Sequence, residues 1–305
     1  MRQFALSLAG LTVGVLLSPN ATAFCRETTC YVSPAPSGCV GSADANGCSN
    51  EGNPLHWSQP CLSFSVQMAG SVKLQIGADL FERQVRTAFD SWSTVICSGG
   101  GSPKFSVVTY PQAACTEVGF RDQGPNQNLW VFRDDGWEHA LTADGALALT
   151  TLSVISSTGE IYDADVELNS HDNAFTTDDL DVKVDLYSIV LHEAGHVLGI
   201  GHSPWSTSTM TGSYANGSID PRSLEADDIN AICAVMPPGE IDPNCKPEPL
   251  HGFSTECAPT APGCCSVAAG WRSSNSRAWV IVVPWLVFAI RRAGSGKGRR
   301  RSAPT

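Results

Sequence analysis

The sequence predicts an α+β fold, in which a mixed twisted sheet packs against two long helices and leads into a small C-terminal subdomain. Three observations support this prediction. Strand patterns dominate the first part of the chain, a long amphipathic helix pattern lies among them, and a second long helix follows a strand pair. Strands and helices grouped in this way, without regular alternation, are typical of α+β domains.

The first elements are read from hydrophobic periodicity. Residues 62–68 alternate strictly between apolar and polar side chains, which predicts a half-buried strand. Residues 78–95 repeat apolar side chains at helical spacing, which predicts an amphipathic helix. Further strands are expected at 104–110 and 128–133. A strand, a helix and two more strands therefore open the domain.

A strand pair and two helices complete the predicted domain. The pair covers 147–155 and 159–169, joined by a turn at 156–159, and the helices cover 185–198 and 224–235. The last helix belongs to the small lower part of the domain.

The second strand of the pair is unusually acidic on one face. Asp163, Asp165 and Glu167 share that face because side chains alternate along a strand. Such a strand is expected at or near the edge of the sheet, with its acids in solvent. A calcium or second zinc site that also uses His171 is the alternative.

Composition and charge narrow the class of protein. The chain has 305 residues and a formal net charge of −11, which argues against a nucleic-acid partner. The positive charge is concentrated at the C-terminus, because residues 291–305 hold six Lys and Arg and no acid. An acidic body with a short basic tail is expected.

Both ends of the chain read as targeting segments. Residues 1–23 combine Arg2, an apolar stretch and an Ala-Thr-Ala site, which predicts a secretory signal cleaved after Ala23. Residues 278–290 are uncharged and are followed by the basic cluster. This stretch is shorter than the ~20 residues that cross a bilayer comfortably, and it is interpreted as a stop or sorting tail that could anchor the protein to the membrane or cell envelope.

The 12 cysteines favour disulfides, since an exported chain meets an oxidising environment and no paired CxxC motif is present. Their connectivity stays open at this point. Four of them lie between 25 and 48, in a region rich in Gly, Ser, Pro and Asn that is read as a stapled lead-in segment.

The most informative stretch is HEAGHVLGIGHS, residues 192–203. On a helix, His192 and His196 lie one turn apart and can present ring nitrogens to one cation. His202 can join them only if the chain turns sharply, and a glycine with positive φ at Gly199 allows that turn. Three imidazoles leave a fourth position open, which is the geometry of a catalytic zinc. Glu193 would then take a proton from a zinc-bound water that attacks a carbonyl carbon.

This stretch resembles the zinc signature of the metzincin metallopeptidases, and Ser203 directly after the third histidine resembles the matrixins among them. The resemblance implies a metzincin-like fold with a zinc cleft between the two parts of the domain. It identifies Met210 as the methionine of the turn beneath the zinc ligands, and Gly212 and Tyr214 as candidates for the wall of the specificity pocket. Gly212 stands where matrixins usually have proline. An extended substrate would lie antiparallel to an edge strand, for which 159–169 is the candidate.

The predicted organisation follows from these features. After the signal peptide come a Cys-rich segment (24–60), a matrixin-like catalytic domain (61–238), a Cys- and Pro-rich linker (239–276) and the tail (277–305). The tail resembles C-terminal sorting signals of myxobacteria and related bacteria. The proline-arginine-cysteine-glycine motif that keeps many matrixins latent does not occur, so latency stays open.

The expected function is that of a secreted or surface-anchored zinc endopeptidase with one catalytic Zn²⁺, acting on extracellular proteins or peptides. A catalytically silent, zinc-stabilised surface module that binds peptides is one alternative, and a zinc amidase acting on non-protein substrates is another. Glu193 favours an enzyme, because a silent relative could lose it at no structural cost.

Overall fold

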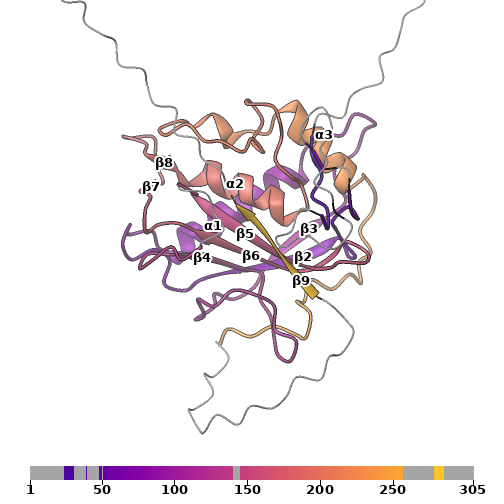
Figure 1. Ribbon diagram of the computed structural model, residues 1–305, viewed down its shortest axis with the longest axis horizontal. Helices are drawn as coiled ribbons and strands as arrows, with labels where there is room; N and C mark the ends of the chain where they lie inside the picture. The colour runs from indigo at the N-terminus through magenta and orange to yellow at the C-terminus, as the bar shows by residue number, and fades with distance from the viewer. Residues whose placement is uncertain are drawn as a thin grey trace, which may run out of the picture.

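The computed structural model describes residues 24–30, 39, 48–49, 51–139 and 145–256, and the backbone of 278–284. The elements in chain order are β1 (His56–Trp57), β2 (Cys61–Val66), α1 (Ala78–Ser93), β3 (Ser106–Thr109), β4 (Leu129–Phe132), β5 (Ala148–Ile155), β6 (Glu160–Leu168), β7 (Phe175–Thr176), β8 (Val184–Asp185), α2 (Leu186–Val197), the 3₁₀ turn η1 (Asp220–Arg222), α3 (Ala226–Val235) and β9 (Ala278–Pro284) (Figure 1). Every helix and strand expected between residues 62 and 235 is present.

The main sheet is mixed, as the sequence predicts. Its strand order is β3-β2-β4-β6-β5-β9, with β1 paired to β6. The pairs β2–β3, β2–β4 and β4–β6 are parallel, whereas β5 runs antiparallel to β6. Together with the long helices α1 and α2 and the short α3, this arrangement is the expected α+β fold.

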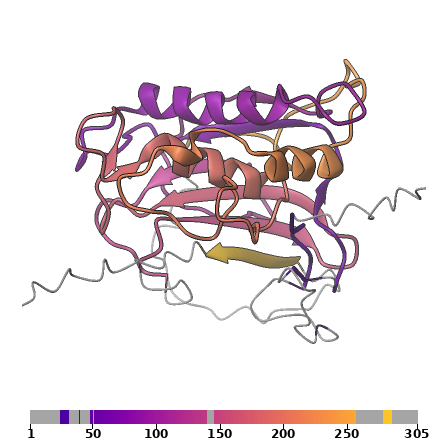
Figure 2. The same ribbon diagram turned by 90° about the horizontal axis from the view of Figure 1, so that it is seen from above.

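The helix α1 buries one apolar face against the sheet and against α2. Its buried residues recur at helical spacing from Ala78 to Trp92. The indole N–H of Trp92, a fully buried side chain, donates to the carbonyl of Leu191 in α2 at 2.9 Å. This bond ties the two helices together at the level of the histidine motif, and Figure 2 shows them running in one layer.

The strand β6 lies in the interior of the sheet, so the prediction that 159–169 is an edge strand is wrong. It pairs with β4 on one side and with β5 on the other. Asp163, Asp165 and Glu167 are each at most 2% exposed, so the prediction of solvated acids is wrong as well. Loops cover this face of the sheet, and a polar strand face indicates solvent only where nothing packs over it.

The buried acids Asp165 and Glu167 find partners in the neighbouring strand β4 and in the segments on either side of it. Asp165 accepts backbone N–H bonds from Gly119 and Leu129, and Glu167 contacts Arg133 and His139. Burial nevertheless raises the pKa of Asp165 to about 7. His171 pairs with Asp172 on the surface, at 2.8 Å, so the structure does not bring it into the acidic face. The calcium or second zinc site stays a prediction.

The outer side of β5 is paired with β9, which comes from the predicted tail. Leu149–Ile155 and Ala278–Pro284 run antiparallel over seven residue pairs. β9 is the last strand in the order, and Figure 2 shows it at the margin of the sheet. The apolar tail segment thus adds a strand to the domain, where the sequence suggested a stretch that leaves the folded body.

Four disulfides are described, which confirms the expectation from the cysteine content. They link Cys25 to Cys48, Cys30 to Cys39, Cys61 to Cys245 and Cys97 to Cys233. The predicted signal peptide, 1–23, and the basic cluster after residue 290 lie outside the described residues. Over the part of the chain that the structure describes, no helix is both long and apolar enough to cross a bilayer.

Candidate metal centre and active site

The helix α2 carries the first two histidines and is fixed at its N-terminus by Asp185. This N-cap carboxylate accepts the backbone N–H of Ser188 at 2.9 Å, which satisfies one of the free donors of the first turn. It also receives two bonds from Arg222, at 2.6 and 2.9 Å. The residues of α2 are buried except Tyr187, so the histidines enter the domain on a rigid support.

The C-terminus of α2 makes the turn that brings His202 back. Gly199 has φ +91°, and its N–H donates to the carbonyl of His196 at 2.9 Å. The N–H of Ile200 donates to the carbonyl of Gly195 at 3.0 Å, which completes a Schellman motif. The predicted role of Gly199 is confirmed, since a residue with a Cβ is strained at this φ.

The three predicted histidines converge. Nε2 of His196 lies 3.0 Å from Nε2 of His192 and 3.2 Å from Nε2 of His202. Within the described ranges, these are the three side chains that form a set of convergent metal-ligand atoms. The structure therefore brings together every histidine that the motif assigns to the metal.

The donor set fits a zinc ion. Nδ1 of His192 is 2.7 Å from the carbonyl oxygen of Thr209, and Nδ1 of His196 is 2.8 Å from that of Ile200. Each Nδ1 therefore carries the proton and donates it, which leaves the Nε2 lone pairs facing one another. Facing lone pairs repel unless a cation lies between them, and tetrahedral zinc with Zn–N bonds of ~2.0–2.1 Å separates its nitrogens by about 3.3 Å.

The imidazoles are also in the protonation state that metals bind. Burial, and after it the neighbouring rings, hold the pKa of His192 and His196 well below the ordinary value. Burial lowers the pKa of His202 to about 4. Neutral rings at physiological pH need not lose a proton before they coordinate a cation.

Glu193 lies beside the triad with one oxygen engaged and one unpaired. The side chain is fully buried, and its Oε2 accepts the hydroxyl of Thr150 in β5 at 2.5 Å. Its Oε1 has no hydrogen-bond partner among the described residues. Burial raises the pKa of Glu193 to about 8, while the Thr150 bond acts in the opposite direction. Thr150 was not identified from the sequence, because its contact with Glu193 depends on how β5 packs against α2.

Met210 packs against the helix that carries His192 and His196, and its role beneath the zinc ligands stays a prediction. It is 1% exposed and closely approaches Gly195 of α2. Its turn is held by Asp228 of α3, whose carboxylate accepts the N–H of Met210 at 3.0 Å and that of Thr209 at 2.8 Å. Asp228 thus connects the last helix to the floor of the site. The Glu225–Asp228 spacing of a capping box is the sequence signal that marks it.

Gly212 and Tyr214 occupy different environments. A Cβ on Gly212 would lie 3.3 Å from Nδ1 of His202, so the glycine packs directly against that ring. Tyr214 is 3% exposed, and its hydroxyl donates to Ser218 and accepts the N–H of Asp185 at 2.9 Å. Gly212 therefore lies at the metal centre, whereas the Tyr214 hydroxyl fixes the start of α2. Their role in a specificity pocket stays a prediction.

Comparisons with known proteins agree with this geometry. The family model described as Matrixin matches residues 56–236, close to the predicted 61–238. Metalloendoproteinase 1-MMP of Arabidopsis thaliana is 27% identical over 192 residues, which cover 60% of this chain and 44% of that protein. Matrix metalloproteinase-C of Caenorhabditis elegans is 27% identical over 190 residues, covering 60% of this chain and 29% of the relative.

The chain thus spans less than half the length of the curated relatives that it matches. The matched region nonetheless extends over more than half of this chain and contains the whole histidine triad, Glu193 and Met210. On this match and on the site geometry, the chain belongs to the matrixin family.

Proposed function

We propose that the protein is an exported zinc-dependent endopeptidase that hydrolyses peptide bonds in extracellular proteins or peptides. The observation that carries the proposal is the unpaired Oε1 of the buried Glu193 next to three convergent imidazoles. A fully buried carboxylate oxygen without a partner is costly to keep, and buried groups of this kind are enriched at functional sites.

His192, His196 and His202 would hold the zinc ion through Nε2. When bound, zinc acts as a Lewis acid that polarises the scissile carbonyl and acidifies water at neutral pH. Oε1 of Glu193 is the atom that accepts the proton of the attacking water and later passes it to the leaving amine. The Thr150 hydroxyl on Oε2 restrains rotation of the carboxylate, and Oε1 is the oxygen left available to the attacking water.

The substrate is best accommodated along β5. This strand carries Thr150, which contacts Glu193, so a peptide paired to its outer side passes next to the proton acceptor. Pairing to a sheet edge uses backbone hydrogen bonds and therefore accepts many sequences in extended form. β9 occupies this side of β5, so a substrate would have to displace it; its antiparallel pairing supports the proposal, because the backbone groups on this side of β5 bond to another strand. Export and anchoring rest on the sequence of the two terminal segments alone.

The test is Glu193→Gln. The neutral isostere keeps the shape of the side chain but cannot accept the proton, so peptide cleavage should fall about 10²–10⁴-fold while zinc stays bound at one per chain. Cleavage of a diverse peptide library and metal analysis measure the two quantities, and Glu160→Gln, on β6, is the matched control. Full activity of Glu193→Gln would refute the mechanism. A wild-type protein that binds zinc but cleaves none of the peptides would instead favour the silent surface module.

A further inference from the structure

The segment 24–30, called the N-terminal strap below, is built into the support of the metal centre. On one side, the N–H of Gly201 donates to Cys25 at 3.0 Å and the N–H of Glu27 donates to Gly199 at 3.2 Å. On the other side, the N–H of Leu55 donates to the carbonyl of Glu27 at 2.8 Å. The strap therefore lies between the turn that positions His202 and the chain that leads into β1.

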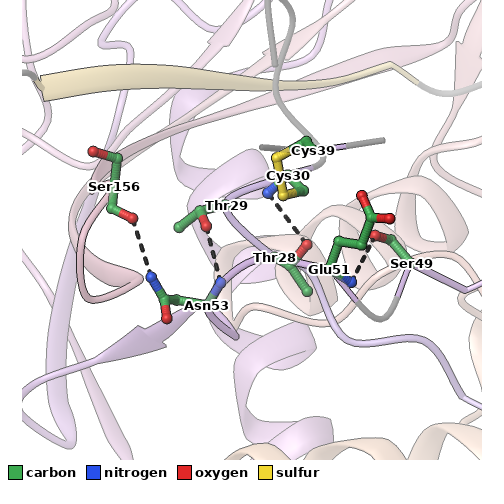
Figure 3. Close-up of a disulfide and its surroundings, with 8 residues drawn as sticks. All are labelled: Thr28, Thr29, Cys30, Cys39, Ser49, Glu51, Asn53 and Ser156. Carbon is green, nitrogen blue, oxygen red and sulfur yellow. Dashed lines mark hydrogen bonds between the residues drawn. A yellow bond between two sulfur atoms is a disulfide. The ribbon is translucent and has the colours of Figure 1, made fainter. Parts of the chain in front are cut away.

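Covalent and polar links hold the strap in this place. Cys25 is bonded to Cys48, and Cys30 to Cys39. Figure 3 shows the second disulfide with its surroundings, where Thr29 Oγ1 accepts the N–H of Asn53 at 2.9 Å. The amide of Asn53 in turn donates to the carbonyl of Ser156, in the turn between β5 and β6, at 3.2 Å. The strap is thereby connected to the sheet as well as to the end of α2.

The strap carries one buried acid that nothing described so far explains. Glu27 is 1% exposed, and neither of its carboxylate oxygens has a hydrogen-bond partner among the described residues. Its Oε1 lies 3.9 Å from Nδ1 of His196. A Cβ on Gly201 would lie 3.3 Å from the same oxygen, so the absence of a side chain there leaves room for the carboxylate.

Two simpler roles do not fit this placement. Glu27 is not placed as a metal ligand, because it faces Nδ1 of His196, whereas the other histidines meet that ring at Nε2. Glu27 is not paired with its neighbour Arg26 either. Nη2 of Arg26 donates instead to the carbonyl of Leu55 at 3.2 Å. Among the described residues, the one charged or chargeable group within ion-pair distance of Glu27 is His196.

We propose that Glu27 is a positioning residue of the metal centre, acting through the Nδ1 edge of His196. A metal ion on Nε2 draws electron density from the imidazole, so Nδ1–H becomes more positive. A carboxylate on that side stabilises the ring in its metal-bound form and orientation. The Nδ1–H of His196 donates to the carbonyl of Ile200, so Glu27 acts on the ring through its charge at 3.9 Å. Groups that accept the N–H of a ligating histidine commonly change metal affinity by ~10–100-fold, and the lower end of that range is expected for Glu27. The Cys-rich region is therefore part of the site, and not a removable lead-in segment.

The test compares Glu27→Gln with wild type, using the full oxidised chain stripped of metal by a chelator. Zinc affinity is measured by competition with a chromophoric chelator, and the visible spectrum of the Co²⁺-loaded protein reports the ligand geometry. Glu27→Gln should bind zinc about tenfold or more weakly and shift the Co²⁺ spectrum. Its metal-free form should unfold at no lower urea concentration than wild type, because no hydrogen bond is lost. Glu51→Gln, a half-buried glutamate of the same disulfide-linked region, should behave like wild type.

The outcomes separate this inference from the proposed function on which it rests. A wild-type protein that binds no stoichiometric zinc would overturn both. A wild-type protein that binds zinc, together with a Glu27→Gln variant of equal affinity and unchanged Co²⁺ spectrum, would overturn the role of Glu27 alone. A weaker affinity accompanied by an equal loss of metal-free stability would show that Glu27 supports only the fold, and would overturn the inference too.

Discussion

Gly195, between the two histidines of α2, offers a sharp test of how the metal site is packed. A Cβ at this position would lie 2.9 Å from Cζ2 of Trp92 and 3.0 Å from Cε of Met210, and it would come closer still to the Met210 sulfur. Carbon atoms in contact normally lie ~3.5–4.0 Å apart. Gly195→Ala therefore requires a neighbour to move, although alanine is the better helix former.

Neither neighbour can move easily. Trp92 is held by its bond to Leu191, and the Met210 side chain is buried at 1% exposure, so a shift of its sulfur displaces other core atoms. Overpacking a tight core lowers the free energy of unfolding by about 1–3 kcal/mol. Replacing a helical glycine by alanine raises it by about 1 kcal/mol, because alanine is the better helix former. We expect a net loss of up to about 2 kcal/mol of unfolding free energy, which for a domain of this size lowers Tm by up to roughly 8 °C.

Urea unfolding of the metal-free protein measures this loss, and a double-mutant cycle with Met210→Ala identifies its cause. Truncation of Met210 makes room for the new methyl group, so the double variant should be more stable than the sum of the two single changes predicts, by at least about 1 kcal/mol. Gly99→Ala is the control, since a Cβ there meets nothing within 4 Å. Additive effects, or a Gly195→Ala variant more stable than wild type, would refute the packing described here.

Three further predictions concern the metal, the buried acids and the tail. A chelator should abolish peptide cleavage and added zinc should restore it; cleavage that persists in metal-free protein would exclude the proposed mechanism. Burial raises the pKa of Asp163, and that of Asp165 from 3.8 to about 7. The folded chain thus holds these protons more tightly than the unfolded chain, and urea unfolding of metal-free protein should show stability falling as the pH rises from about 4 to 7. Asp163→Asn should flatten that slope; an equal slope would contradict the assignment. Deleting residues 257–305 removes β9, and steady-state kinetics should then give a lower KM at similar kcat, whereas an unchanged KM would show that β9 does not compete with substrate.

The sequence predicted the elements of the fold well because each has a local signal. The apolar residues of α1 recur with a period that only a helix satisfies, and β2 alternates with a period of two. The prediction that β2 is half-buried is wrong, because all six of its residues are buried. The position of β6 was misjudged for a physical reason. Alternation shows which residues share a face, but whether water or a loop covers that face depends on segments distant in sequence, such as the one that carries Gly119 and Leu129.

Contacts between segments distant in sequence are also the part of the metal site that the sequence does not reveal. His192, Glu193, His196 and His202 fall within one short motif whose geometry follows from a helix and a glycine turn, so they could be identified from the sequence. Thr150 and Glu27 could not, because they reach the motif from β5 and from the N-terminal strap. A threonine in a strand and a glutamate near a cysteine carry no local sign that they will be buried beside a histidine.

Each histidine of the triad is in fact supported by a different part of the chain. His192 donates to the turn that ends in Met210, His196 lies against Glu27, and His202 packs on Gly212. A convergent triad forms only when these segments are docked, so part of the free energy of metal binding is free energy of folding. Zinc should accordingly slow hydrogen exchange in the strap and in the Met210 turn, and not only in α2. Protection confined to α2 would mean that the helix forms the site alone and that the outer supports are dispensable.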